Sequence, residues 1–135
     1  MSSISFRRPV HLDRDRVWAG LLHKAADPTS YISAITGCTV LEREPGALVR
    51  EIVVNGSIRH RERAVFHAPD RIVFHQLTDS SLDTIVNTIE EEDGVLYLRL
   101  TITGTPGRLA EMHDYFAHTL EEIVTALHAG AGAPT

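Results

Sequence analysis

The sequence predicts an α+β fold made of antiparallel strands and one long C-terminal helix. The stretch from Cys38 to Thr103 consists of short β-type segments separated by turn residues, as is typical of antiparallel sheets. Asn55-Gly56 and Asp93-Gly94 predict hairpin turns, because these residues tolerate positive φ. After Pro106, apolar residues recur every three or four positions for about six turns, which indicates a helix.

The first part of the chain is expected to form one strand and two short helices. The first ten residues alternate between apolar and polar, and Pro9 favours a sheet edge or a strand end. Asp13 is a candidate N-cap for an amphipathic helix over residues 14–26, which Asp27-Pro28 ends. A second short helix is expected around residues 31–35 from its apolar spacing.

The middle of the chain is expected to hold six strands, followed by a helix over residues 106–129. Thr105 is the candidate N-cap of that helix, and Pro106 suits its first position. Residues 1–130 are expected to form a single domain and residues 131–135 a flexible tail. The strands are expected near residues 38–43, 47–54, 57–67, 71–77, 83–92 and 95–103.

Composition and charge exclude several classes of protein. The 135 residues are 43% hydrophobic and 23% charged, which is ordinary for a soluble globular protein. The net charge of −5 argues against nucleic-acid binding. A single cysteine, Cys38, cannot form an internal disulfide. Because the sequence holds no apolar run long enough for a membrane span and no signal peptide, a cytoplasmic location is expected.

The order of one strand, two short helices, six strands and a long helix resembles the helix-grip fold of the START and birch-pollen-allergen-like (SRPBCC) superfamily. That resemblance implies a curved seven-stranded antiparallel sheet wrapped around the C-terminal helix, with a ligand cavity between them. Four segments, Val17–Pro28, Gly37–Arg43, Leu48–Glu51 and Arg61–Arg63, are similar to the AtaL-like subgroup, some of whose members are encoded in natural-product clusters. The subgroup offers no catalytic motif to carry over.

The first hairpin turn predicts which side chains of its two strands enter the cavity. If Asn55-Gly56 is a two-residue turn, Glu51 lies opposite His60 on one face. The other face is rich in arginine and is expected to lie in water. It carries Arg59, Arg61 and Arg63. The inner face is therefore expected to add Val49, Glu62, Ala64 and Phe66.

The second hairpin turn, at Asp93-Gly94, predicts an inner face that is almost entirely apolar. Asn87, opposite Leu100, is its polar exception. The other cavity residues expected from this hairpin are Ile85, Ile89 and Leu98. The long helix is expected to add Met112 and Phe116 from its sheet-facing stripe. His113 lies beside them, either in the cavity or, as is favoured, at its boundary.

The strand after the turn at Ala68–Asp70 has two alternative registers. A tight turn places His75 in the cavity beside Glu62. A turn that is one residue longer places Phe74 and Gln76 there instead, and the richer apolar content of that face favours it. The sequence leaves both alternatives open.

Glu51, His60 and Glu62 are the candidate catalytic groups, with Asn87 orienting a substrate carbonyl. Burial raises the pKa of a carboxyl group, which suits general acid/base chemistry near neutral pH. The expected function is a small-molecule enzyme of natural-product or secondary metabolism. It would act on an apolar, cyclic or polyketide-like substrate by cyclisation, dehydration or isomerisation. The alternative is a non-catalytic hydrophobic ligand binder or carrier that uses the same cavity, and a structural role is favoured least.

No metal or cofactor is expected. His60, Glu62 and His75 have the residue types of a metal site, but no recognised ligand spacing supports one. Nucleotide-binding glycine motifs are absent from the sequence. The expected partner is a small apolar organic ligand. An exposed strand edge near Pro9 permits either a monomer or a homodimer.

Overall fold

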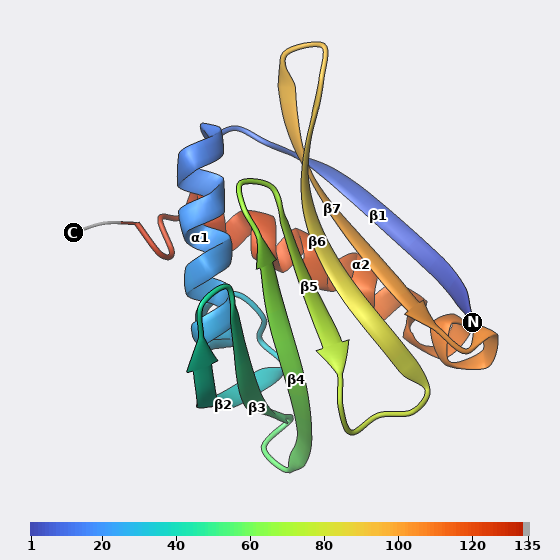
Figure 1. Cartoon of the computed structure of the whole chain (residues 1–135). Coiled ribbons are helices and arrows are strands. Elements are labelled where there is room, and N and C mark those ends of the chain that lie inside the picture. The colour runs from blue at the N-terminus through green and yellow to red at the C-terminus, as the bar shows by residue number, and fades with distance from the viewer. Residues whose placement is uncertain (134–135) are drawn as a thin grey trace.

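A computed structural model describes residues 1–133, which form a seven-stranded antiparallel sheet, two α-helices and one 3₁₀ turn (Figure 1). The strands are β1 (Ser2–Val10), β2 (Ile35–Glu44), β3 (Ala47–Val54), β4 (Ile58–His67), β5 (Arg71–Gln76), β6 (Leu82–Glu92) and β7 (Val95–Gly104). The helices are α1 (Arg14–Ala26) and α2 (Pro106–His128), and the 3₁₀ turn η1 is Pro28–Ser30.

The strand order is β1-β7-β6-β5-β4-β3-β2, so the first strand of the chain pairs with the last. The sheet curves, and α2 lies across one side of it with α1 near the C-terminal half of α2 (Figure 1). The predicted α+β helix-grip fold is confirmed. Within the described residues, neither helix has a stretch that is both long and apolar enough to cross a membrane.

The two α-helices begin where their capping residues predict. The Asp13 carboxylate accepts a hydrogen bond from the Arg16 backbone N–H at 2.8 Å, and Thr105 accepts one from the Arg108 N–H at 3.4 Å. Pro106 occupies the first position of α2. Of the expected tail, residues 134–135 lie outside the described residues, whereas the Ala131 carbonyl accepts a hydrogen bond from Arg16 Nη2 at 2.8 Å.

The second short helix differs from the prediction in both place and type. It is the single turn η1, and residue 35 already begins β2. Asp27 caps this turn, because its carboxylate accepts hydrogen bonds from the Thr29 N–H and hydroxyl at 3.3 and 2.7 Å. The apolar spacing of Tyr31 and Ile32 reflects burial in the core, where they are 2% and 7% exposed, rather than a helix.

The β6–β7 hairpin has the predicted register. Asn87 pairs with Leu100 and Glu91 with Leu96. Asp93-Gly94 forms the turn, and its two φ angles are 52° and 78°.

The β3–β4 hairpin is one residue longer at its turn than predicted. Asn55-Gly56 does adopt positive φ, and the Ser57 N–H donates to the Val54 carbonyl at 3.2 Å. However, the Asn55 and Gly56 N–H groups donate to Ala34 and Thr36, which ties the turn to the beginning of β2. Strand pairing then starts at Ile58, opposite Val54, and leaves Ser57 in the connection.

This extra residue corrects the predicted faces of the hairpin. Ile52, not Glu51, lies opposite His60, and Arg50 lies opposite Glu62. The even-numbered residues of β3 therefore share the inner face with the even-numbered residues of β4. The prediction that Glu51 faces His60 is wrong.

The β4–β5 connection has the longer of the two alternative turns. His67 pairs with Arg71, so three residues connect the strands. Phe74 and Gln76 consequently share the inner face with Glu62, whereas His75 is exposed on the other face.

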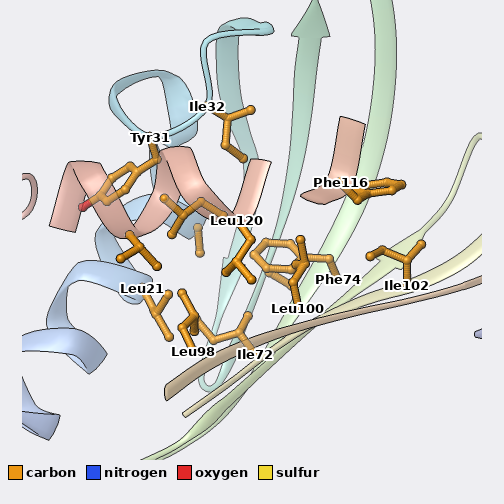
Figure 2. Packing of buried hydrophobic residues seen from close by; sticks show 14 of the residues in the cluster. Leu21, Tyr31, Ile32, Ile72, Phe74, Leu98, Leu100, Ile102, Phe116 and Leu120 are labelled. Atoms are coloured by element: carbon orange, nitrogen blue, oxygen red, sulfur yellow. The ribbon is translucent and has the colours of Figure 1, made fainter. Parts of the chain in front are cut away.

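The core lies between the sheet and the two α-helices. Figure 2 shows apolar side chains converging from the sheet and from α2, and Phe74 is only 1% exposed. Each such side chain stabilises the fold by roughly 1.5–3 kcal/mol through its burial. Other members of the cluster are Leu21, Leu98, Leu100, Ile102, Leu120, Ile123 and Leu127. Part of this cluster also forms the wall of a cavity.

Candidate functional site

A cavity of about 400 Å³ lies between the concave face of the sheet and α2. Alternate residues of β3 to β6, Leu100 of β7, the sheet-facing side of α2 and the end of α1 line it. A volume of this size is typical of small-molecule sites.

The cavity is closed at one end and more exposed at the other. At the closed end Arg50 and Glu62 are only 4% and 3% exposed. The other end lies among the β3–β4 turn, the β5–β6 loop and the first turns of α2, where Ile58 is 51% exposed. A ligand would therefore enter beside Ile58 and meet buried polar groups at the far end.

An ion pair between Arg50 and Glu62 lies at the closed end. Arg50 Nε and Nη2 both donate to Glu62 Oε1, at 2.9 and 2.7 Å. Gln76 Nε2 donates to the other carboxylate oxygen at 2.7 Å. Arg50 Nη1 also donates to the carbonyls of Lys24 and Ala25 at 3.2 and 3.0 Å, where α1 ends. Both oxygens of Glu62 are thus occupied by protein donors.

Lys24 extends from the last turn of α1 into the same end of the cavity. Its side chain is buried, and Nζ lies 4.7 Å from the centroid of the Phe74 ring. The Arg50 guanidinium carbon lies 4.5 Å from the same centroid. Burial and the Arg50 charge lower the pKa of Lys24, the Glu62 charge acts in the opposite direction, and the net result is a pKa of about 7.

His60 and Asp79 lie nearer the entrance. His60 is half-buried on the inner face of β4, two residues before Glu62. Burial opposes ionisation of Asp79, but hydrogen bonds from Ser81 and the charges of Arg108 and His60 lower its pKa overall. This part of the cavity combines a carboxylate with an imidazole that solvent can reach.

Asn87 and Tyr115 are the remaining polar groups of note. Asn87 Oδ1 is buried and has no hydrogen-bond partner within residues 1–133. A buried acceptor without a partner is costly to the fold, and a ligand donor would satisfy it. Tyr115 lines the cavity from α2, and burial raises the pKa of its phenol.

The structure brings part of the predicted site together. The predicted residues that line the cavity are His60, Glu62, Ile85, Asn87, Met112 and Phe116. Four others, Ala64, Phe66, Ile89 and Leu98, belong to the surrounding core or pack against it instead. Arg59, Arg61 and Arg63 are exposed, as expected.

Four predicted site residues lie elsewhere, and the hairpin registers explain three of them. Glu51 is on the outer face, where it accepts hydrogen bonds from Arg59 and Arg61 at 2.9 and 3.2 Å. These hydrogen bonds lower its pKa, the reverse of the expected direction. The same change of register removes Val49 from the inner face, and the longer β4–β5 turn removes His75.

His113 is the fourth residue, and it occupies the boundary position that was favoured. Its side chain is 56% exposed, and its ring packs edge-on against Phe6 of β1 at a centroid distance of 5.0 Å. It also lies 3.1 Å from the Asp114 carboxylate. It therefore does not reach the cavity.

Several polar residues that line the cavity were not predicted as site residues, although Gln76 was one of the two alternatives on β5. They are Lys24, Arg50, Asn55, Gln76, Asp79, Arg108, Tyr115 and Thr119. A signal for Lys24 was present, because only one of the thirteen basic residues is lysine. The two-residue turn expected from the sequence places Arg50 on the arginine-rich outer face, whereas the observed pairing with Glu62 places it on the inner face. Within the described residues, no three His, Cys, Asp or Glu side chains gather in a way that suits a metal ion.

The chain is similar to known proteins in sequence pattern and in structure. The family model described as "Acetylaranotin biosynthesis cluster protein L" (AtaL) matches residues 6–126. No curated protein sequence matches the chain. The Zhui aromatase/cyclase from Streptomyces sp. R1128 superposes with a TM-score of 0.72 at 17% identity, over 96% of this chain and 93% of that one.

Two further solved structures show how widely the fold is shared. The di-domain aromatase/cyclase StfQ of the steffimycin biosynthetic pathway has a TM-score of 0.73 at 18% identity over 96% of this chain. Ara h 8.0201 has a TM-score of 0.66 at 10% identity, over 95% of this chain and 98% of that one. The chain spans about half the length of StfQ and of the di-domain protein BexL, 50% and 51% respectively. At these identities the structural similarity concerns the fold.

Proposed function

The chain belongs to the AtaL family, within the SRPBCC superfamily, and from this membership and its cavity we propose that it is an enzyme of natural-product metabolism. Its substrate is an apolar, cyclic or polyketide-like molecule. Its reaction is a proton transfer that leads to cyclisation, dehydration or isomerisation. The observation that carries the proposal is an apolar cavity with ionisable groups at its closed end. We expect the protein to act as a monomer or as a homodimer.

The walls of the cavity support an apolar ring system as the substrate. Phe74, Leu100 and Phe116 are 4% exposed or less and offer flat or branched apolar surfaces. Such contacts contribute binding free energy in proportion to the apolar area of the ring that they bury, so this contribution depends little on the exact substituents of the ring. The polar groups then orient the molecule, and Asn87 Oδ1 accepts a hydrogen bond from a substrate hydroxyl.

His60 is the proposed acid/base group. Glu62 cannot easily exchange a proton with a substrate, since Arg50 and Gln76 donate to both of its oxygens. Its proposed role is to fix Arg50 and to balance buried positive charge. His60 is half-buried and within reach of solvent, and its imidazole nitrogens can accept and donate a proton. The role expected for Glu51 is not retained.

The second candidate function is a non-catalytic binder or carrier. It is supported by the same network, because the Arg50–Glu62–Gln76 cluster satisfies its own hydrogen bonds and needs no substrate proton. In a carrier these groups would only orient the ligand.

Proton exchange on a bound ketone separates the two functions. 2-Tetralone, a bicyclic ketone, would be incubated with the protein in D₂O, with binding followed by saturation-transfer NMR and α-deuteration by ¹H NMR. An enzyme should raise the exchange rate by at least about 10²-fold over buffer, which is the usual contribution of acid/base catalysis. His60→Gln should retain binding and lose most of this acceleration. His67→Gln, exposed on the same strand, should change neither.

Each other outcome has a clear meaning. Binding of 2-tetralone without exchange above buffer in the wild-type protein would favour the carrier. Full exchange in His60→Gln would overturn the role of His60. A protein that does not bind 2-tetralone at all would contradict the proposed ligand class.

A further inference from the structure

The chain has one lysine, and that lysine is buried in the cavity. Twelve other residues carry a permanent positive charge, and all of them are arginine. Lysine is rarely buried without a partner, because its ammonium group is strongly hydrated. Lys24 is nevertheless only 3% exposed.

The amine of Lys24 is not committed to another group of the protein. Within residues 1–133, Nζ makes no hydrogen bond and no ion pair, since Glu62 is taken up by Arg50 and Gln76. Nζ lies over the face of the Phe74 ring, 4.7 Å from its centroid. A primary amine that lines a cavity and lacks a partner is available to a ligand.

Burial, and after it the charge of Arg50, favours the neutral form of Lys24. Arg50 on β3 repels the ammonium, and Glu62 on β4 attracts it less strongly because it already neutralises Arg50. From α2, the ionisable cavity group on this side is Tyr115, whose raised pKa keeps it uncharged near neutral pH. With a pKa of about 7, close to half of the Lys24 amine is unprotonated and nucleophilic near pH 7.

We propose that Lys24 forms a Schiff base with the carbonyl carbon of a ligand bound in the cavity. The inference rests on the proposed function and names its substrate class, an aldehyde or ketone attached to an apolar ring system. The Nζ lone pair attacks the carbonyl carbon while the carbonyl oxygen takes up a proton. The resulting carbinolamine loses water and leaves a C=N bond to Lys24. Water is the only molecule released and no atom changes its oxidation state, so no oxidant or reductant is required.

A Schiff base would serve the proposed chemistry directly. The protonated C=N group withdraws electrons from the neighbouring carbon, so a proton there is lost more easily. His60 lines the same cavity and is the group to which that proton is passed. Proton transfer next to a carbonyl is the step that cyclisation and isomerisation of such molecules share.

Reductive trapping tests the inference. The wild-type protein would be mixed with 2-naphthaldehyde and sodium cyanoborohydride, which reduces the C=N bond and leaves one naphthylmethyl group on the amine. Intact mass and peptide mapping then locate the label. The α-amine of Met1 is the internal reference, because it is the one primary amine of the chain besides Lys24, and Met1 is 72% exposed. Lys24 should be labelled at least about 10-fold faster than Met1, since binding holds the carbonyl near it.

Three controls separate labelling through the cavity from ordinary amine chemistry. An excess of 2-naphthalenemethanol, which has the ring without the carbonyl, should slow labelling of Lys24 and not of Met1. Lys24→Arg should keep the positive charge and lose the cavity label. Arg61→Lys adds an exposed lysine to the outer face of β4, and its label should form no faster than that of Met1.

Labelling of Lys24 that is no faster than that of Met1, or that the alcohol does not slow, overturns the inference. This failure is distinguishable from failure of the proposed function. If 2-tetralone binds and exchanges equally well in Lys24→Arg, then acid/base catalysis stands without a Schiff base. If the wild-type protein binds neither 2-tetralone nor 2-naphthaldehyde, the proposed function itself is contradicted.

Discussion

Arg50 and Glu62 face each other across β3 and β4, and their charged groups meet at 2.7 Å with only 4% of each side chain exposed. Arg50 also donates to the carbonyls of Lys24 and Ala25. A single guanidinium therefore links two strands of the sheet to the end of α1. The closed end of the cavity depends on this link.

Removing one member of this pair should be strongly destabilising. Arg50→Met leaves the Glu62 carboxylate buried without its cation and removes two hydrogen bonds to α1, so we expect a loss of about 3–5 kcal/mol in the free energy of unfolding. Urea denaturation followed by circular dichroism measures this. The double variant Arg50→Met/Glu62→Met should recover much of the loss. Arg59→Met, whose side chain is 68% exposed, should lose less than about 1 kcal/mol.

Lys24→Met should stabilise the protein, and the gain should depend on pH. The pKa of Lys24 falls from 10.5 to about 7 on folding, so between these values the unfolded chain binds the extra proton. Wild-type stability therefore rises with pH across this window, and the penalty is largest below pH 7. We expect the variant to gain roughly 3–5 kcal/mol at pH 6 and much less at pH 10. Equal gains at both pH values in urea denaturation would contradict the lowered pKa.

Asn87→Leu should raise the stability of the fold and weaken the binding of ligands that donate a hydrogen bond. The substitution removes a buried carbonyl oxygen that has no partner among the described residues, so we expect a gain of about 1 kcal/mol or more in unfolding free energy. It should also weaken binding of 2-naphthol, which donates a hydrogen bond, relative to 2-methylnaphthalene, which does not. Competition with a fluorescent apolar probe measures both affinities. An unchanged ratio of the two would show that Asn87 does not contact the ligand.

Two glycines near the start of α2 form a matched pair. A Cβ on Gly104 would lie 2.7 Å from the Ser81 carbonyl oxygen, which the Thr105 N–H holds at 2.9 Å. Gly104→Ala should therefore lose about 1–3 kcal/mol of stability through overpacking. Gly107 has open space around its Cα, so Gly107→Ala should be neutral or gain up to about 1 kcal/mol from helix propensity. Thermal denaturation of both variants tests the contrast.

The fold could be predicted because its local and long-range patterns agree. Asp13 and Thr105 mark the beginnings of the two α-helices. Asp93-Gly94 predicts a hairpin with one apolar face, and α2 carries a matching apolar stripe. Each of these features acts over a few residues, so the sequence alone displays it. The sequence predicts the second short helix in the wrong place, because buried residues of a loop can have helical spacing.

The site was harder to predict, because a single residue in one turn decides which side chains enter it. Ser57 remains in the β3–β4 connection, owing to hydrogen bonds between that turn and the beginning of β2. These bonds join segments about twenty positions apart, and turn propensity does not report them. The result exchanges Glu51 for Arg50 on the inner face. The place of Lys24 is hard to predict for a different reason, since a lysine in an amphipathic helix normally lies on its solvated face.

The lone buried lysine also makes the interior of this protein selectively observable. Protein produced with lysine carrying ¹³C at the ε-carbon would contain a single labelled methylene, and that methylene belongs to a cavity residue. Its carbon resonance differs among an ammonium, a free amine and an imine. One peak in a spectrum of the unmodified protein therefore reports what the closed end of the cavity contains, with no need to assign the remaining resonances.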